Sequence, residues 1–120
     1  MEESYLDRLE KIRWPDGRCC SFCGSDKVSA APMKGRSYRC YKCKTFFSVM
    51  SKSFMSHSKL SAEMWFLLID LADTDVAPWM ITRHTGTDHG IVSLTMKKIR
   101  AAAKDDFLRR IKIDIAENGA

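Results

Sequence analysis

The apolar positions of the chain follow two different patterns, and the change falls near residue 61. Before it, a single apolar stripe with Ser4 as N-cap predicts a short amphipathic helix over residues 4–13. Pro15 disfavours helical geometry in the residue before it, so this helix is expected to stop at Trp14. Trp14 is interpreted as a hydrophobic plug between this helix and the segment that follows.

Three short strands are predicted between residues 28 and 49. The first covers Val28 to Met33, and a turn at Lys34–Gly35 leads into the second, which covers Ser37 to Cys40. The third covers residues 45–49, where β-branched and aromatic side chains follow one another. Few apolar residues are available there, so a metal ion rather than a hydrophobic core is expected to hold this sheet.

A helical period takes over from residue 61. A first helix over residues 62–72 carries a broad apolar stripe and is capped by Ser61. A second helix is predicted from about Ala77 to His84 and ends at Gly86. The third helix begins after Asp88, and its apolar positions are Val92, Met96, Ile99 and Ala103.

Three short helices with a glycine turn between the last two predict a helix-turn-helix module over residues 61–104. In such a module the last helix enters the major groove of DNA, with its first residues at the base edges. The alternative is a small helical bundle with an ordinary solvated face. The candidate DNA contacts off the apolar stripe of the third helix are His89, Ser93, Lys97 and Arg100.

Two segments show no clear period. Residues 51–60 are predicted to be an irregular, serine-rich connector, in which His57 is expected to be exposed rather than a metal ligand. Residues 105–120 carry more apolar surface than a free tail should. We expect this segment either to pack back onto the helices or to form a homodimer contact.

Four of the five cysteines occur in two pairs with the spacing of metal ligands. Two residues separate Cys20 from Cys23 and Cys40 from Cys43, and sixteen residues lie between the pairs. Four thiolates fill the tetrahedral coordination of Zn²⁺ and leave no position for substrate, which predicts one structural zinc ion. Cys19 lies out of register and is not expected to bind it. Iron, held as in rubredoxin, is the alternative, and the basic surroundings favour zinc.

The predicted architecture is a small α+β protein in which a three-stranded, four-cysteine zinc ribbon precedes a three-helix helix-turn-helix module. Its expected parts are an N-terminal helix and turn (1–18), the ribbon (19–50), the connector (51–60), the helix-turn-helix (61–104) and a C-terminal segment (105–120).

Charge separates the two halves of the chain. The net charge is +5 and the isoelectric point is about 9.0, which indicates a polyanionic partner. No acidic residue lies between Asp26 and Glu63, whereas residues 61–120 carry eight basic and nine acidic side chains. An uncompensated basic stretch favours contact with phosphates over the alternative of a plain solvated face. Its candidate DNA contacts are Lys34, Arg36, Arg39, Lys42, Lys44 and Lys52.

Composition excludes several classes of protein. Apolar residues make up 45% and charged residues 29%, as in folded soluble proteins. The chain has no apolar run of membrane-spanning length and no signal-peptide pattern, so a cytoplasmic location is expected, without a membrane or small-molecule partner. Asp70, Asp73 and Asp75 are clustered, but they are interpreted as a polar helix face and a helix end rather than as a catalytic group.

A combination of motifs resembles the N-terminal region of ISXO-like insertion-sequence transposases, in order and spacing, from about residue 5 to residue 103. In that family this region is a zinc ribbon and helix-turn-helix that bind the terminal repeats of the element, so the resemblance implies DNA binding. The motifs are Arg13–Gly17, Cys20-x2-Cys23-Gly24, Cys40-x2-Cys43, Thr45–Val49, Lys59–Leu60 and Trp65–Phe66.

In the same family a catalytic domain of ribonuclease-H-like fold follows, and its first strand ends in an aspartate. Residues 111–119 look like a degenerate trace of that strand, in which Asp114 would match the aspartate and Ile115 replaces the usual glutamate. Two-metal chemistry needs several converging carboxylates. The resemblance therefore implies DNA binding without strand transfer, and the chain is not expected to be an enzyme.

The leading hypothesis is a sequence-specific, double-stranded DNA-binding protein derived from a transposase, which acts as a bacterial transcriptional regulator. One alternative is the N-terminal DNA-binding fragment of an active insertion-sequence transposase. Another is a zinc-ribbon adaptor that docks on RNA polymerase.

Overall fold

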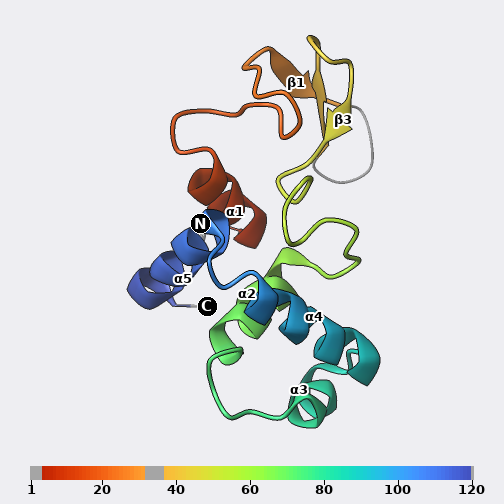
Figure 1. Ribbon diagram of the computed structural model, residues 1–120, viewed down its shortest axis with the longest axis vertical. Helices are drawn as coiled ribbons and strands as arrows, with labels where there is room; N and C mark the ends of the chain where they lie inside the picture. The colour runs from red at the N-terminus through yellow and green to blue at the C-terminus, as the bar shows by residue number, and fades with distance from the viewer. Residues whose placement is uncertain (1–3, 32–36, 120) are drawn as a thin grey trace. The chain divides into compact units, whose positions relative to one another are not determined.

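The computed structural model describes residues 4–31 and 37–119 of the chain. The chain divides into two compact units (Figure 1). We call Met1–Lys59 the ribbon unit and Leu60–Ala120 the helical unit. Among the helices of the described residues, none has the length and hydrophobicity needed to cross a bilayer.

The ribbon unit begins with helix α1, Tyr5–Arg13. Its first turn is closed by a capping box, in which the Asp7 amide donates to Ser4 Oγ at 3.1 Å and the Ser4 amide donates to Asp7 Oδ2 at 3.3 Å. Trp14 caps the other end and is buried, with its ring edge-on to Tyr38 and Phe47 at centroid distances of 6.0 and 5.9 Å. The predicted plug is confirmed.

The sheet of the ribbon unit has three antiparallel strands in the order β1-β2-β3 (Figure 1). These are β1, Val28–Ala30; β2, Tyr38–Cys40; and β3, Phe46–Phe47. Tyr38, Cys40 and Phe47 are buried, and Arg39 and Phe46 are exposed.

Two strands are shorter than the sequence indicated. The first ends at Ala30, and the Lys34–Gly35 turn lies outside the described residues. The third ends at Phe47, because the next residues fold into a turn in which the Ser48 amide donates to Ser51 Oγ at 2.8 Å. Serine side chains compete with strand pairing in this way, since they offer the backbone a local partner.

The connector is a chain of such turns. Ser53 Oγ donates to the Met50 carbonyl at 2.6 Å and accepts the Met55 amide at 3.1 Å. The Met55 side chain is fully buried, which anchors the segment, and His57 is exposed as expected. His57 and Lys52 both have left-handed backbone, with φ of 64° and 52°.

The helical unit contains four helices, and the elements are α2, Ala62–Leu71; α3, Pro78–Thr85; α4, His89–Ala101; and α5, Asp106–Asn118 (Figure 1). Helix α2 packs against α4 and α5, and α3 packs against α4. Ser61 caps α2 by accepting the Met64 amide at 3.2 Å. The side chains that are almost fully buried between these helices are Trp65, Phe66, Leu68, Ile69, Val92, Met96, Ile99, Leu108 and Ile111.

Two expectations for the end of the chain were wrong. Residues 111–119, which resembled a catalytic strand, belong to α5 and the residue after it, and Asp114 accepts an intrahelical hydrogen bond from Asn118 at 3.1 Å. Asp105 starts this helix by accepting the Leu108 amide at 3.1 Å. Ala103 lies beyond α4 and is exposed, so the apolar stripe of α4 ends at Ile99.

Helix α5 packs back onto α2 through its buried residues Leu108 and Ile111. This is the first of the two alternatives for residues 105–120. A homodimer contact stays a prediction.

Candidate metal centre and nucleic-acid surface

The four cysteines predicted as ligands converge on one point. Cys20 Sγ lies 3.6 Å from Cys43 Sγ, and Cys23 Sγ lies 3.5 Å from Cys40 Sγ. All four sulfurs are within 4.8 Å of one another. A tetrahedral ion with Zn–S bonds of about 2.3 Å requires S–S separations of about 3.8 Å, so the set fits zinc.

Each pair is positioned by a tight turn of the same kind. The Cys20 amide donates to the Ser25 carbonyl at 2.8 Å, and the Cys40 amide donates to the Thr45 carbonyl at 3.0 Å. Backbone amides also point at the sulfurs, as in the 3.4 Å contact from the Cys23 amide to Cys20 Sγ. Such amides stabilise thiolates, because they place positive hydrogen ends against negative sulfur.

Both turns end in left-handed backbone. Gly24 has φ of 80°, which glycine adopts without steric cost. The matching residue of the second turn is Lys44, with φ of 58°, which costs about 1–2 kcal/mol for a residue with a Cβ. The second turn therefore keeps a basic side chain where a glycine would be easier to accommodate.

The surroundings of Cys23, Cys40 and Cys43 shift the pKa values of these thiols in different directions. A hydrogen bond with Thr45, together with those with the other three cysteines, lowers the pKa of Cys43 to about 6. The Cys43 amide, as the main cause, lowers the pKa of Cys40. A backbone hydrogen bond with Ser25 lowers the pKa of Cys23, but desolvation and the neighbouring sulfurs outweigh it and raise that pKa to about 11.

Residues 1–45 match the family described as the transposase zinc-ribbon domain. The N-terminal part of this chain is therefore similar to transposase zinc ribbons. The match includes all four cysteines, whose convergence makes the ribbon the site of one structural zinc ion. No curated protein and no solved structure matches the chain.

Other candidate ligands stay outside this centre. Among the described residues, the four cysteines are the one group of three or more Cys, His, Asp and Glu side chains placed to share a metal ion. Cys19 is adjacent to them and half-buried, but it is not in the group. Asp73 instead pairs with Lys112 of α5 at 3.1 Å.

The pKa values predict how zinc binding by the ribbon depends on pH. Cys23, with its raised pKa, holds a proton at neutral pH, and zinc must displace it. Cys43 is a thiolate above about pH 6 and takes up a proton below it, so binding there must displace a further proton. We expect zinc affinity to fall by at least about tenfold for each unit by which the pH is lowered near neutrality, and more steeply below about pH 6.

A competition titration with a chromophoric chelator between about pH 5 and pH 8 measures this slope. An affinity that does not change over that range would contradict the assignment of a protonated Cys23 in the metal-free ribbon.

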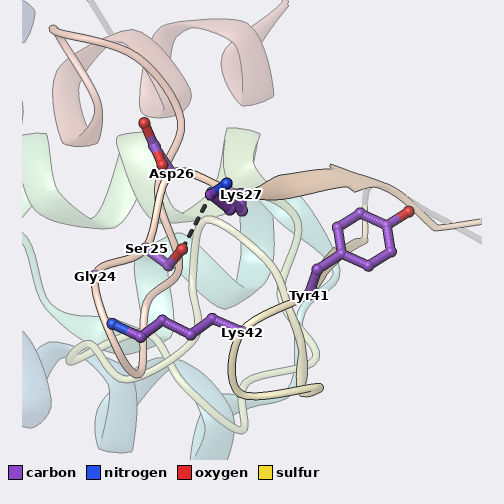
Figure 2. Close-up of a pocket in the computed structure, with 6 residues that line it drawn as sticks. All are labelled: Gly24, Ser25, Asp26, Lys27, Tyr41 and Lys42. Atoms are coloured by element: carbon purple, nitrogen blue, oxygen red, sulfur yellow. Dashed lines mark hydrogen bonds between the residues drawn. The ribbon is translucent and has the colours of Figure 1, made fainter.

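The basic residues predicted to contact DNA are distributed over both units. Arg39, Lys42, Lys44 and Lys52 are exposed on the ribbon unit, whereas Lys34 and Arg36 lie outside the described residues. Figure 2 shows a shallow pocket where the two cysteine turns meet, with the side chains of Lys42 and Tyr41 extending in opposite directions. It is lined by Gly24, Ser25, Asp26, Lys27, Tyr41 and Lys42.

The predicted contacts on α4 follow one side of that helix, because they recur every three or four residues. Three of them, His89, Lys97 and Arg100, are exposed, and Ser93 is half-buried. Sequence reasoning did not single out Leu94 and Ile91 of the same helix, which are 56% and 46% exposed. Their positions outside the apolar stripe of the helix were the sequence signal that these two apolar side chains are exposed.

Proposed function

We propose that this protein is a sequence-specific DNA-binding protein in which the ribbon unit holds phosphates and the helical unit reads bases. One observation carries the proposal: the ribbon is similar to transposase zinc ribbons, and it exposes Arg39, Lys42 and Lys44 close to its zinc centre. Clustered cations of this kind bind the phosphate backbone, because each phosphate neutralised releases counterions into solution.

The geometry of α3 and α4 supports a helix-turn-helix role. Only three residues, Gly86–Asp88, join the two helices. Gly86 is left-handed with φ of 75°, and its amide donates to the Thr82 carbonyl at 2.9 Å. Asp88 then starts α4 by accepting the Ile91 amide at 3.1 Å. A short glycine turn between packed helices is typical of this motif.

On this proposal α4 is the recognition helix. His89, at its first turn, is placed for base edges in the major groove, and Lys97 and Arg100, further along, are placed for phosphates. The buried stripe of Val92, Met96 and Ile99 adjoins this row on α4, and its packing in the helical unit orients the row.

We further propose that the protein acts as a transcriptional regulator without catalysing strand transfer. The segment that resembled the first catalytic strand folds as α5, and its Asp114 is engaged within that helix. The second candidate function is the end-binding part of a transposase, which the ribbon match itself favours.

Electrophoretic shifts against a library of genomic fragments, followed by sequencing of the bound fraction, test these proposals. Specific DNA binding predicts a few enriched fragments at low salt. Enrichment of promoter regions supports a regulator, and enrichment of insertion-element ends supports the transposase role. Absence of binding at low salt, or binding that does not distinguish sequences, would refute the proposal. Capture of purified RNA polymerase by the protein, with and without DNA, tests the adaptor role.

Substitutions on α4 test the recognition helix. We expect Lys97→Ala and Arg100→Ala each to weaken duplex binding and to reduce the salt dependence by about one unit of log–log slope, because each removes a phosphate contact. Lys98→Ala is the matched control, since it removes the same charge from the same helix outside the predicted row. Fluorescence anisotropy over a series of salt concentrations measures the slopes. Equal slopes for Lys97→Ala and Lys98→Ala would show that another face of α4 meets the DNA.

A further inference from the structure

The sheet of the ribbon unit has one face that is open to solvent. Ser29 of β1 pairs with Arg39 of β2, and Arg39 pairs with Phe46 of β3, so the three side chains form a row across the sheet. Their strand neighbours Tyr38 and Phe47 point the other way and are buried beneath Trp14. Strand pairing therefore places Ser29, Arg39 and Phe46 together on the outer face.

Two aromatic rings are exposed on this face. Phe46 is 49% exposed, and Tyr41, just after β2, is 58% exposed. The Arg39 guanidinium carbon lies 5.7 Å from the centre of the Phe46 ring and 6.0 Å from that of Tyr41. The Tyr41 hydroxyl shares a 2.6 Å hydrogen bond with Ser29 Oγ. These contacts hold both rings in place at the surface, so little ordering is left for a ligand to bring about.

Basic residues lie close to these rings in the chain. The Tyr41 amide donates to the Lys27 carbonyl at 3.0 Å. Lys42 follows Tyr41, and its side chain extends away from the Tyr41 ring (Figure 2). Asp26 is the acidic residue that lines the adjoining pocket. An exposed apolar protein contact would not need this surplus of cations, whereas a polyanion with flat apolar groups matches both features.

We propose that this face, formed by Ser29, Arg39, Tyr41 and Phe46 and called here the stacking face, binds single-stranded nucleic acid. Unpaired bases stack on Tyr41 and Phe46, and Arg39, whose guanidinium lies close to both rings, holds the phosphate between them. Aromatic rings with an arginine among them bind single strands with little sequence preference, because every base has a flat π-face. In a paired duplex those base faces are covered by their neighbours, so the stacking face selects unpaired nucleotides.

This activity is distinct from duplex reading by α4 and does not depend on it. It gives the ribbon unit a ligand of its own: the unpaired bases of a melted, gapped or single-stranded segment.

Fluorescence anisotropy with the zinc-loaded full chain tests the inference. The probes are labelled oligothymidylate and oligouridylate of about twelve nucleotides and a blunt-ended two-strand duplex of similar length. We expect Tyr41→Ala and Phe46→Ala each to weaken binding of the single strands by roughly fivefold or more, and binding of the duplex by less than about twofold. Phe46→Trp should retain single-strand binding, since a larger ring stacks at least as well.

Phe22→Ala is the matched control. Phe22 is 47% exposed on the same unit, but it lines a different pocket with connector residues such as Met50 and Ser56. Zinc content shows whether each variant is folded. Equal binding of DNA and RNA strands would fit stacking, and a preference for one would identify the sugar as a further determinant within the same proposal.

Three outcomes would overturn the inference. The first is that the wild-type protein binds no single strand at low salt. The second is that Phe22→Ala weakens single-strand binding as much as Tyr41→Ala. The third is that the stacking-face variants lose only RNA polymerase binding, which would make this face a protein-docking surface. Loss of duplex binding by the α4 variants is a separate result, so failure of the proposed function and failure of this inference are distinguishable.

Discussion

Replacing Cys40 by serine is expected to release the zinc ion and unfold the ribbon unit. Cys40 is fully buried at the end of β2, and its sulfur lies 3.5 Å from that of Cys23. Structural zinc contributes roughly 10–16 kcal/mol of apparent binding free energy in zinc-finger peptides, which is as large as the total stability of most domains. The strands of two and three residues could not compensate for that loss.

Zinc stoichiometry, measured by elemental analysis of the purified variant, and the dispersion of ribbon amide resonances are the two readouts. Cys19→Ser is the control, since it removes a neighbouring thiol that is not in the metal-binding group. It should retain one zinc ion per chain. Stoichiometric zinc in Cys40→Ser, or zinc loss in Cys19→Ser, would mean that the ligand set is different from the one assigned.

Replacing Leu108 by alanine is expected to destabilise the helical unit by about 2–5 kcal/mol. Leu108 is fully buried on α5, which packs against α2, and its removal leaves a cavity that the surrounding helices fill only in part. Because small domains are stable by about 5–15 kcal/mol, this is a large share of the total.

Urea denaturation followed by far-ultraviolet circular dichroism measures the loss. Ile113→Ala is the matched control on the same helix, because Ile113 is 54% exposed, and its change should stay within about 0.5 kcal/mol. If the two variants were equally stable, α5 would not be docked as described, and a homodimer contact through this helix would become the better account of its apolar side.

Short-range geometry explains why the zinc centre could be predicted. A thiolate pair two residues apart is presented by one turn, so the Cys20–Cys23 and Cys40–Cys43 pairs carry their own local structure in the sequence. The same holds for the helix starts at Ser4, Ser61 and Asp88, where each side chain bonds an amide three residues later. Such hydrogen bonds depend on the near neighbours in the chain and on little else.

The lengths of the strands and the helical structure of α5 could not be predicted, because they depend on competition between local and distant contacts. Val49 is a residue type that favours a strand. The strand nevertheless ends at Phe47, because the Ser48 amide forms its hydrogen bond with the Ser51 side chain in a turn and not with a neighbouring strand. The three-residue spacing of Leu108 and Ile111 fits a helix. The two-residue spacing of Ile111, Ile113 and Ile115 fits a strand. Packing of the helical face onto α2 decides between them.

The sequence by itself determined the four ligands, the extent of α2 to α4 within a few residues, and the concentration of positive charge before residue 61, because each depends on residue type and local spacing. Only the tertiary structure decided which side chains share a surface. Ser29, Arg39 and Phe46 become neighbours through the register of three strands. Strand register joins residues that are distant in the chain, and no local pattern specifies it.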